Sequence, residues 1–185
     1  MRTPGLWLAL PVILLAAACG PPDQPAEPVE ESVTNELLGI RLDPLPPDFA
    51  VAVNDDRGLE LVPVAAKVGG RVVFEVGDEE PLIDLVAAVH RHQRWVEEMP
   101  GADYKGGQEL VTPLGSAFYS RGRYLAGADL VEDTVLVSKH PSSNRLLVIS
   151  YRYPAGADSS VRVQQLLEIV SVVQAVGSGA APAGP

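Results

Sequence analysis

The chain has little of several features that define common protein classes. Among its 185 residues there is one cysteine, and aromatic side chains make up only 5% of the sequence. A single cysteine cannot close a disulfide within the chain, which excludes a disulfide-stapled scaffold. Basic residues are also scarce, because 14 lysines and arginines face 24 aspartates and glutamates, for a net charge of −10. That balance lacks the positive surface of nucleic-acid binders, so we expect no nucleic-acid partner.

Long apolar runs are absent as well, apart from a short one near the amino end. Leu6–Ala18 would span about 20 Å as a helix, short of the roughly 30 Å core of a bilayer. With the basic Arg2 before it, the run has the length and flanks of a signal peptide, which we assign to residues 1–18. We expect no other segment of the chain to span a membrane.

The end of this run places the only cysteine directly after small residues, in the letters LAAACG at positions 15–20. This pattern resembles the lipobox of bacterial lipoproteins, although Ala16 stands where that family prefers leucine. The resemblance implies cleavage before Cys19, attachment of diacylglycerol to its sulfur, and acylation of the new amine. The alternative is an ordinary secretory signal that leaves a free thiol on Cys19.

A lipid on Cys19 would decide where the protein is kept. Each buried CH₂ contributes about 0.8 kcal/mol, so two or three long chains hold a protein at a membrane far longer than one short chain. We therefore expect the membrane as a partner through Cys19, on the extracytoplasmic side of the cell envelope. Gly20, rather than aspartate, follows the cysteine. In a bacterium with two membranes, the resemblance then implies the periplasmic face of the outer membrane.

Low-complexity segments flank one region of globular composition. After Cys19, residues 19–36 hold four prolines, five acidic residues and no basic residue, which predicts a disordered tether. Residues 177–185 predict a disordered tail. Between them, residues 37–176 predict a single domain.

Within that domain, alternating apolar residues predict strands separated by turns. The predicted strands are Phe49–Val53, Leu59–Val64, Arg71–Val76, Gln108–Pro113, Ala117–Tyr124, Asp133–Lys139 and Arg145–Tyr153. Because Pro63 cannot donate to a ladder, its strand is expected to lie at an edge or to bulge there.

Apolar residues at helical spacing predict two main helices, at about 81–99 and 159–176. Pro81 suits the first turn of the earlier helix. Residues 102–108, which include two adjacent glycines, predict a loop. The order of strands and helices predicts an α+β fold, an antiparallel β-sheet sandwich with two main helices.

This order is similar to that of the PsbP-like sandwich, whose members include photosystem lumen proteins and a nuclear-import factor. The shared features are an amphipathic helix after an N-terminal strand block, a block of hairpin strands and a closing helix. The hairpin block holds the segments SAFYSRGRY (116–124) and RLLVISYRYP (145–154). The resemblance implies partner binding by analogy of fold.

The histidines do not predict a metal site. His90 and His92 lie two apart on the predicted helix, about 200° around its axis, so they cannot bind one metal from one face. His140 stands in a separate turn, and no histidine or cysteine has the spacing of a zinc site. We therefore expect no metal and no cofactor.

No serine has the setting of a catalytic nucleophile, because none lies in a G-x-S-x-G elbow. A serine could be combined with His140 and Asp133 into a catalytic site, but no spacing in the sequence requires this. Trp95 lies beside the apolar stripe of the predicted helix, which indicates a role in core packing. We expect no catalytic residue, and a non-catalytic binding or accessory role towards an envelope partner. The alternatives are a carrier of a small apolar ligand and an envelope hydrolase with no recognisable motif. A buried cluster of charge-paired His, Asp or Ser would favour the enzyme.

Four basic residues are candidates for contact with a partner. Strand alternation puts Arg121 and Arg123 on one face of their strand. If the next strands pair as consecutive hairpins, Lys139 and Arg152 are expected to join them on that face. Such a patch would attract an acidic protein surface, glycan or lipid head group. The alternative is that all four are solvated charges balanced by nearby carboxylates.

Lipidation makes a direct prediction about mass. The intact protein from the membrane fraction should lack residues 1–18 and carry a thioether-linked diacylglycerol on Cys19, and Cys19→Ser should lose the lipid. Intact-mass spectrometry measures both. A mature protein that is soluble and has an unmodified Cys19 would contradict the lipobox.

Overall fold

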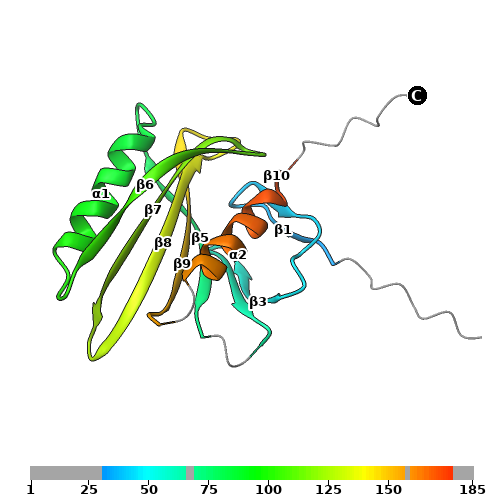
Figure 1. Ribbon diagram of the computed structural model, residues 1–185. Helices are drawn as coiled ribbons and strands as arrows, with labels where there is room; N and C mark the ends of the chain where they lie inside the picture. Colours follow the sequence, from blue (N-terminus) through cyan, green and yellow to red (C-terminus); the bar gives the residue numbers. More distant parts are fainter. Residues whose placement is uncertain (1–30, 66–68, 157–158, 177–185) are drawn as a thin grey trace, which may run out of the picture.

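The computed structural model describes residues 31–65, 69–156 and 159–176, which form one domain of ten strands and two helices (Figure 1). In chain order the elements are β1 (Val33–Asn35), β2 (Ile40–Leu42), β3 (Phe49–Asp55), β4 (Gly58–Pro63), β5 (Arg71–Glu79), α1 (Leu85–Glu97), β6 (Asp103–Thr112), β7 (Gly115–Ala126), β8 (Asp129–Lys139), β9 (Arg145–Pro154), α2 (Ser159–Ser171) and β10 (Val173–Ala175). The predicted signal peptide, Cys19 and the predicted tail fall outside the described residues. No helix in these ranges is long and apolar enough to cross a membrane.

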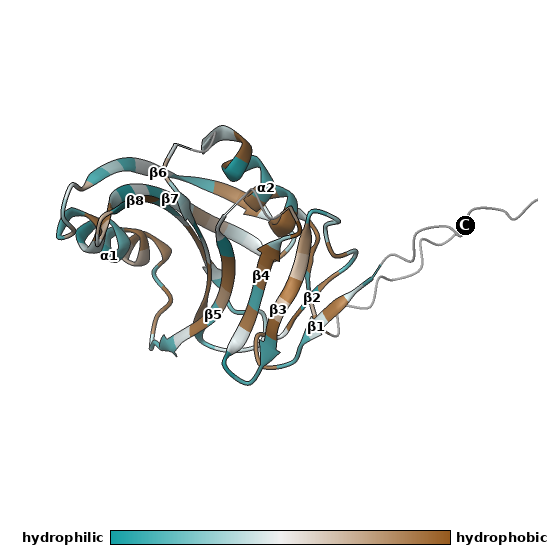
Figure 2. Cartoon of the chain, turned by 90° about the horizontal axis from the view of Figure 1, so that it is seen from below, coloured by the Kyte–Doolittle hydropathy of each residue, from teal (hydrophilic) through white to brown (hydrophobic). Residues whose placement is uncertain are grey.

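The strands form two antiparallel sheets. The larger has seven strands in the order β3-β4-β5-β9-β8-β7-β6, and the smaller has the order β1-β2-β10. Helix α1 packs on one face of the large sheet, over β6, β7 and β8, while α2 and the small sheet lie on the other side (Figures 1 and 2). The predicted α+β sandwich with two main helices is confirmed.

Strand β9 shows how alternation supplies both faces of the large sheet. Leu147, Ile149 and Tyr151 are buried on the face towards α2, which we call the α2 face. Val148 packs on the opposite face, under α1, which we call the α1 face. On the α2 face the core closes with Leu166, Ile169 and Val170 from α2, and with Ile40, Leu42 and Val173 from the small sheet.

Helix α1 begins later than predicted, so the expectation that Pro81 opens its first turn is wrong. Asp84 is the N-cap, with extended backbone, and its Oδ1 accepts a hydrogen bond from the Ala87 N–H at 2.9 Å. A capping carboxylate satisfies N–H groups that the first turn leaves without partners, and so defines where the helix starts. The five residues 80–84 instead connect β5 to the helix.

The second helix ends earlier than predicted. It stops at Ser171, and the chain continues as β10, where Val173 lies opposite Leu42 in β2 and is fully buried. Residues 172–176, which are apolar apart from Gln174, extend the helical pattern in the sequence. Pairing with β2 satisfies their backbone groups and buries Val173, and this tertiary gain overrides the local pattern.

Residues 102–108 are mostly strand rather than loop. Strand β6 starts at Asp103, and its register against β7 shifts between Tyr104 and Gly107. The bulge there places Gly106 at φ +86°, a conformation that favours glycine. The glycines that predicted a loop therefore serve a β-bulge.

Two further expectations about the strands are wrong. Strand β1 lies inside the predicted tether 19–36, and Asn35 is buried, with its amide donating to the Asn54 side chain at 2.8 Å. Strand β4 is internal, between β3 and β5, and Pro63 is its last residue. At the end of a strand the missing N–H of proline costs no ladder bond that the strand needs.

Gly122 in β7 permits the close packing of α1 and makes a testable prediction. A Cβ at this position would lie 2.6 Å from both Cγ1 and Cγ2 of Val96, which is fully buried in α1. We expect Gly122→Ala to lower the free energy of unfolding by about 1–3 kcal/mol, measured by urea unfolding.

Gly77→Ala is the matched control, because the nearest atom to its added Cβ, Leu146 Cβ, is 3.4 Å away. Val96→Ala should recover part of the loss when it is added to Gly122→Ala. Wild-type stability of Gly122→Ala would contradict this packing.

Candidate functional site

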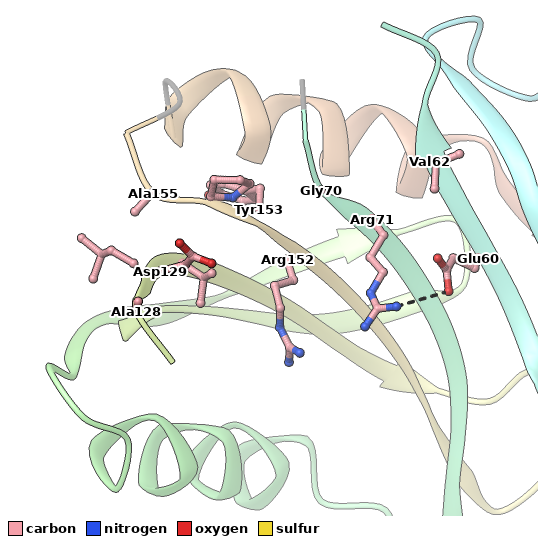
Figure 3. A pocket seen from close by; sticks show the side chains of 12 residues that line it. Glu60, Val62, Gly70, Arg71, Ala128, Asp129, Arg152, Tyr153 and Ala155 are labelled. Carbon is pink, nitrogen blue, oxygen red and sulfur yellow. Dashed lines mark ion pairs between the residues drawn. The ribbon is translucent and has the colours of Figure 1, made fainter. Parts of the chain in front are cut away.

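Helix α1 leaves part of the α1 face uncovered, and two hollows lie there. The α1 groove, of about 420 Å³, lies between the helix and strands β5, β8 and β9. The outer hollow, of about 760 Å³, is lined by parts of β4, β5, β8 and β9 together with the turn between β7 and β8 (Figure 3). Arg152 lines both, so the two hollows meet at this side chain.

The floor and rim of the α1 groove differ in character. Its floor is apolar, formed by Val135, Val137, Leu146 and Val148. Its rim holds the acidic side chains of Glu75 and Asp78, and an ion pair of 2.8 Å joins Glu80 to Arg91 of α1. A ligand in this groove would therefore meet an apolar base and charged edges.

A cluster of polar and aromatic side chains closes the end of the α1 groove nearest Arg152. The Arg152 Nη2 atom donates to Asp133 Oδ2 at 3.1 Å, and the two residues lie directly opposite in β9 and β8. The guanidinium carbon lies 5.8 Å from the centroid of the Trp95 ring, within the range of a cation–π contact. Tyr124 packs edge-on against Trp95, with ring centroids 5.0 Å apart.

His92 joins this cluster from α1. Its Nδ1 is hydrogen-bonded to Ser120 Oγ, and its ring stacks on Trp95 with centroids 5.9 Å apart. Residues four apart lie on one side of a helix, so Ala88, His92 and Val96 all turn towards the sheet. The histidine is thus a fixed part of the site rather than a free surface group.

Two buried polar atoms of the cluster have no hydrogen-bond partner within the described residues, His92 Nε2 and Asp133 Oδ1. Buried polar atoms in folded proteins nearly always have partners, so such pairs of atoms mark sites of function or strain. Asp133 is 2% exposed. The cluster therefore has two polar atoms that could form hydrogen bonds with a bound partner.

Burial sets the titration of the cluster. It lowers the pKa of His92, and the negative charge of Asp133 only partly offsets this. Burial, with a further contribution from Asp133, raises the pKa of Tyr124 to about 12. At neutral pH the cluster thus holds a neutral imidazole and a neutral phenol beside the Asp133–Arg152 ion pair.

The predicted four-residue basic patch is not formed, and this expectation is wrong. Arg123 lies opposite Glu132 and pairs with it on the α2 face, whereas Arg152 lies opposite Asp133. Glu132 and Asp133 are adjacent in β8, and adjacent residues of a strand point to opposite faces. Their partners Arg123 and Arg152 therefore lie on opposite faces of the sheet. Arg121 shares the face of Arg123, and Lys139 that of Arg152. Whether any of the four contacts a partner stays a prediction.

The imagined combination of a serine with His140 and Asp133 is also not formed. The two residues are seven positions apart on or beside β8 and point to opposite faces. His140 is 5% exposed, and its Nδ1 accepts from Ser143 Oγ at 2.9 Å. The His140 Nε2 atom lies 3.3 Å from the carbonyl oxygen of Leu37. This contact joins the turn between β1 and β2 to the end of β8.

A buried His–Ser contact beside a carboxylate is the kind of cluster that would favour an enzyme, but its geometry does not suit a nucleophile. Ser120 is 1% exposed and points from the middle of β7 under α1. No hydrogen bond joins His92 to Asp133 within the described residues, and Asp133 is bound by Arg152 instead. In those same ranges no three His, Cys, Asp or Glu side chains lie together as a metal site would need.

The sequence did not predict that His92, Ser120 and Asp133 lie in one cluster, because the three residues were considered separately. One signal was present. Polar or small residues interrupt the apolar alternation on a single face, at Ser120 and Gly122 in β7, Asp133 in β8, and Ser150 and Arg152 in β9. Their common face became clear only once the register between strands was known.

Comparison with known proteins identifies the fold. No family model matches the chain, and no curated protein matches it by sequence. Among solved structures, the Ran-binding protein Mog1p of Saccharomyces cerevisiae matches with a TM-score of 0.57 and 14% identity, over 79% of this chain and 95% of that chain. PsbP (CyanoP) of the cyanobacterium Synechocystis matches with a TM-score of 0.53 and 10% identity, over 84% and 99%. The fold is PsbP-like.

A third structural neighbour is a bacterial protein. LpqN of Mycobacterium tuberculosis, described as involved in cell envelope biogenesis, matches with a TM-score of 0.52 and 16% identity, over 73% of this chain and 82% of that chain. At these identities the likeness shows the fold alone. The predicted resemblance to the PsbP-like sandwich is confirmed at that level.

The lowered pKa of His92 predicts how stability depends on pH. A group whose pKa is lower in the folded than in the unfolded chain makes unfolding easier as the pH falls below its unfolded value, about 6.5. The free energy of unfolding should therefore decrease between neutral pH and about pH 5.5, and His92→Gln should lose much of that decrease.

Urea unfolding at several pH values measures this dependence. His90→Gln is the matched control, because His90 is exposed on the same helix and its Nδ1 lies within hydrogen-bond distance of Gln93 Oε1. An equal pH dependence in wild type and His92→Gln would show that His92 is not buried as described.

Proposed function

We propose that the chain is a lipid-anchored accessory protein of the bacterial cell envelope, which binds a partner at the α1 face. Three features support this proposal: the lipobox at Cys19, a PsbP-like fold whose neighbours include LpqN and the Ran-binding Mog1p, and the site beneath α1. The observation that carries it is the Asp133–Arg152–Trp95 cluster, which stands where the two hollows meet.

The position of the anchor suits binding at the α1 face. The described chain starts at Glu31, whose carbonyl accepts from the Leu45 N–H at 2.7 Å beside the small sheet. The small sheet lies on the side of the domain away from α1 (Figure 1). A lipid attached through the N-terminal segment would leave the α1 groove and the outer hollow accessible.

An envelope hydrolase is the second candidate, and the His92–Ser120 contact is the observation in its favour. A hydrolytic serine must reach the reacting carbon, with its base on one side and oxyanion donors on the other. Ser120 is buried in the centre of the sheet, so substrate could not reach it in this arrangement. The binding role agrees better with that geometry.

A carrier of a small apolar ligand agrees less well with the charges. Carrier sites are mostly apolar and enclose their ligand. The apolar floor of the α1 groove is bordered by Glu75, Asp78 and the Glu80–Arg91 pair. An apolar ligand there would have to cover charged groups that it cannot satisfy, which costs free energy. A partner surface with its own polar groups avoids this cost.

Photo-crosslinking in intact cells tests the proposal. A photoreactive amino acid in place of Asp78, an exposed residue that lines the α1 groove, should give a discrete adduct with an envelope protein. The same amino acid in place of Gln164, exposed on α2, is the matched control and should give none.

Adducts from Gln164 alone, or from neither position, would contradict binding at the α1 face. A purified chain that hydrolyses an ester or peptide, and loses this activity in Ser120→Ala, would favour the enzyme instead.

A further inference from the structure

Two arginines stand directly opposite one another on the α1 face. Arg71 in β5 and Arg152 in β9 are paired in register, and their side chains lie side by side in the outer hollow (Figure 3). Directly opposed residues of an antiparallel pair have Cβ atoms about 5 Å apart, and like charges in such a pair repel one another. The sheet therefore holds two positive charges together at a local cost.

The close approach of β5 and β9 is built into the backbone. Gly70 has φ +126°, and a Cβ there would lie 2.9 Å from the Arg152 carbonyl oxygen and 3.0 Å from Tyr153 Cβ. Only glycine fits this position without strain, so β5 begins tightly against β9. That approach fixes Arg71 opposite Arg152.

Nearby carboxylates leave much of the two guanidinium groups unused. Arg71 Nη1 lies 3.8 Å from Glu60 Oε2, which is beyond hydrogen-bond distance, and the Arg71 side chain is 55% exposed. Arg152 pairs with Asp133 through Nη2 and remains 44% exposed. Since a guanidinium carries five N–H donors, the pair can still bind an anion between them.

We propose that Arg71 and Arg152 together bind a carboxylate from an acidic segment of the partner protein. This inference rests on the proposed function and names the chemistry of its partner. A planar carboxylate matches the fork of a guanidinium. Glu60 and Asp129 flank the hollow, so a singly charged carboxylate meets less repulsion than a doubly charged phosphate.

The walls of the outer hollow suit a polypeptide segment. Val62, Leu130 and Pro154 line it beside the arginines, and Leu130 is 39% exposed. An acidic residue on the pair would place the side chains next to it against these apolar groups. Burying them adds stabilisation that a free anion would not gain.

Peptide binding to the full chain in a non-ionic detergent tests this inference. The probes are a fluorescent peptide of repeated glutamate, leucine and glycine, and the same peptide with glutamine in place of glutamate. Fluorescence anisotropy should show binding of the glutamate peptide only. Arg71→Gln and Arg152→Gln should each raise its dissociation constant about tenfold, the effect of losing one charge-assisted hydrogen-bonded contact.

Arg121→Gln is the matched control, because it removes the same charge from the opposite face of the sheet and should leave peptide binding unchanged. Arg71→Gln tests the pair without touching the buried Asp133, so its fold should be intact by circular dichroism. Two further arms use inorganic phosphate as a competitor and vesicles of phosphatidylglycerol.

Equal binding of both peptides, an equal loss in Arg121→Gln, or tighter binding of phosphate or vesicles would each overturn the inference. A crosslinked partner at Asp78, with peptide binding unaffected by Arg71→Gln, would sink the arginine site and leave the proposed function standing. Binding that depends on Arg71, without any crosslinked partner, would instead contradict the proposed function.

Discussion

The large sheet carries apolar side chains on both faces, and the need to cover both governs the rest of the structure. Seven strands at about 4.8 Å spacing are roughly 30 Å wide, whereas one helix is about 10 Å across and covers two or three strands. The α2 face is closed by α2 and the small sheet together. Among the described residues, α1 alone covers the α1 face, so strands β4, β5 and β9 keep an open stretch where the two hollows lie.

Charged pairs mark the boundary between covered and open sheet. Glu132 and Asp133 are adjacent in β8 and both buried, yet they point to opposite faces, where Arg123 and Arg152 bind them respectively. A buried carboxylate needs such a partner, because an unpaired charge away from water is costly.

On the α2 face the Glu132 pair has a further hydrogen bond, because the Tyr153 hydroxyl donates to Glu132 at 3.1 Å. On the α1 face the Asp133 pair remains accessible through Arg152, and it lies beside a histidine and a tryptophan. The same arrangement thus stabilises one face and forms a site on the other.

Much of the fold could be predicted from local patterns, and the errors have a common cause. The strands around Leu147–Tyr153 and the amphipathic helix that ends near Glu97 follow from periods of two and 3.6 residues, which are properties of neighbouring residues. The errors at residues 102–108 and 172–176 fall where a distant strand decides the backbone, β7 in one case and β2 in the other. In the sequence, the glycines of the β6 bulge cannot be told from those of a loop. The apolar residues of β10 likewise cannot be told from the end of a helix.

The sequence by itself determined the α+β class, the two main helices and, within each strand, which residues share a face. It also showed the single cysteine behind an apolar leader, on which the predicted anchor depends. Only the tertiary structure decided which faces of different strands coincide. Alternation has a period of two, so a shift of one residue in pairing moves a whole strand's side chains to the other face. For this reason the four basic residues of the predicted patch lie on two faces, Arg121 and Arg123 on one and Lys139 and Arg152 on the other. For the same reason Arg71 and Arg152, distant in sequence, stand opposite each other beside Gly70.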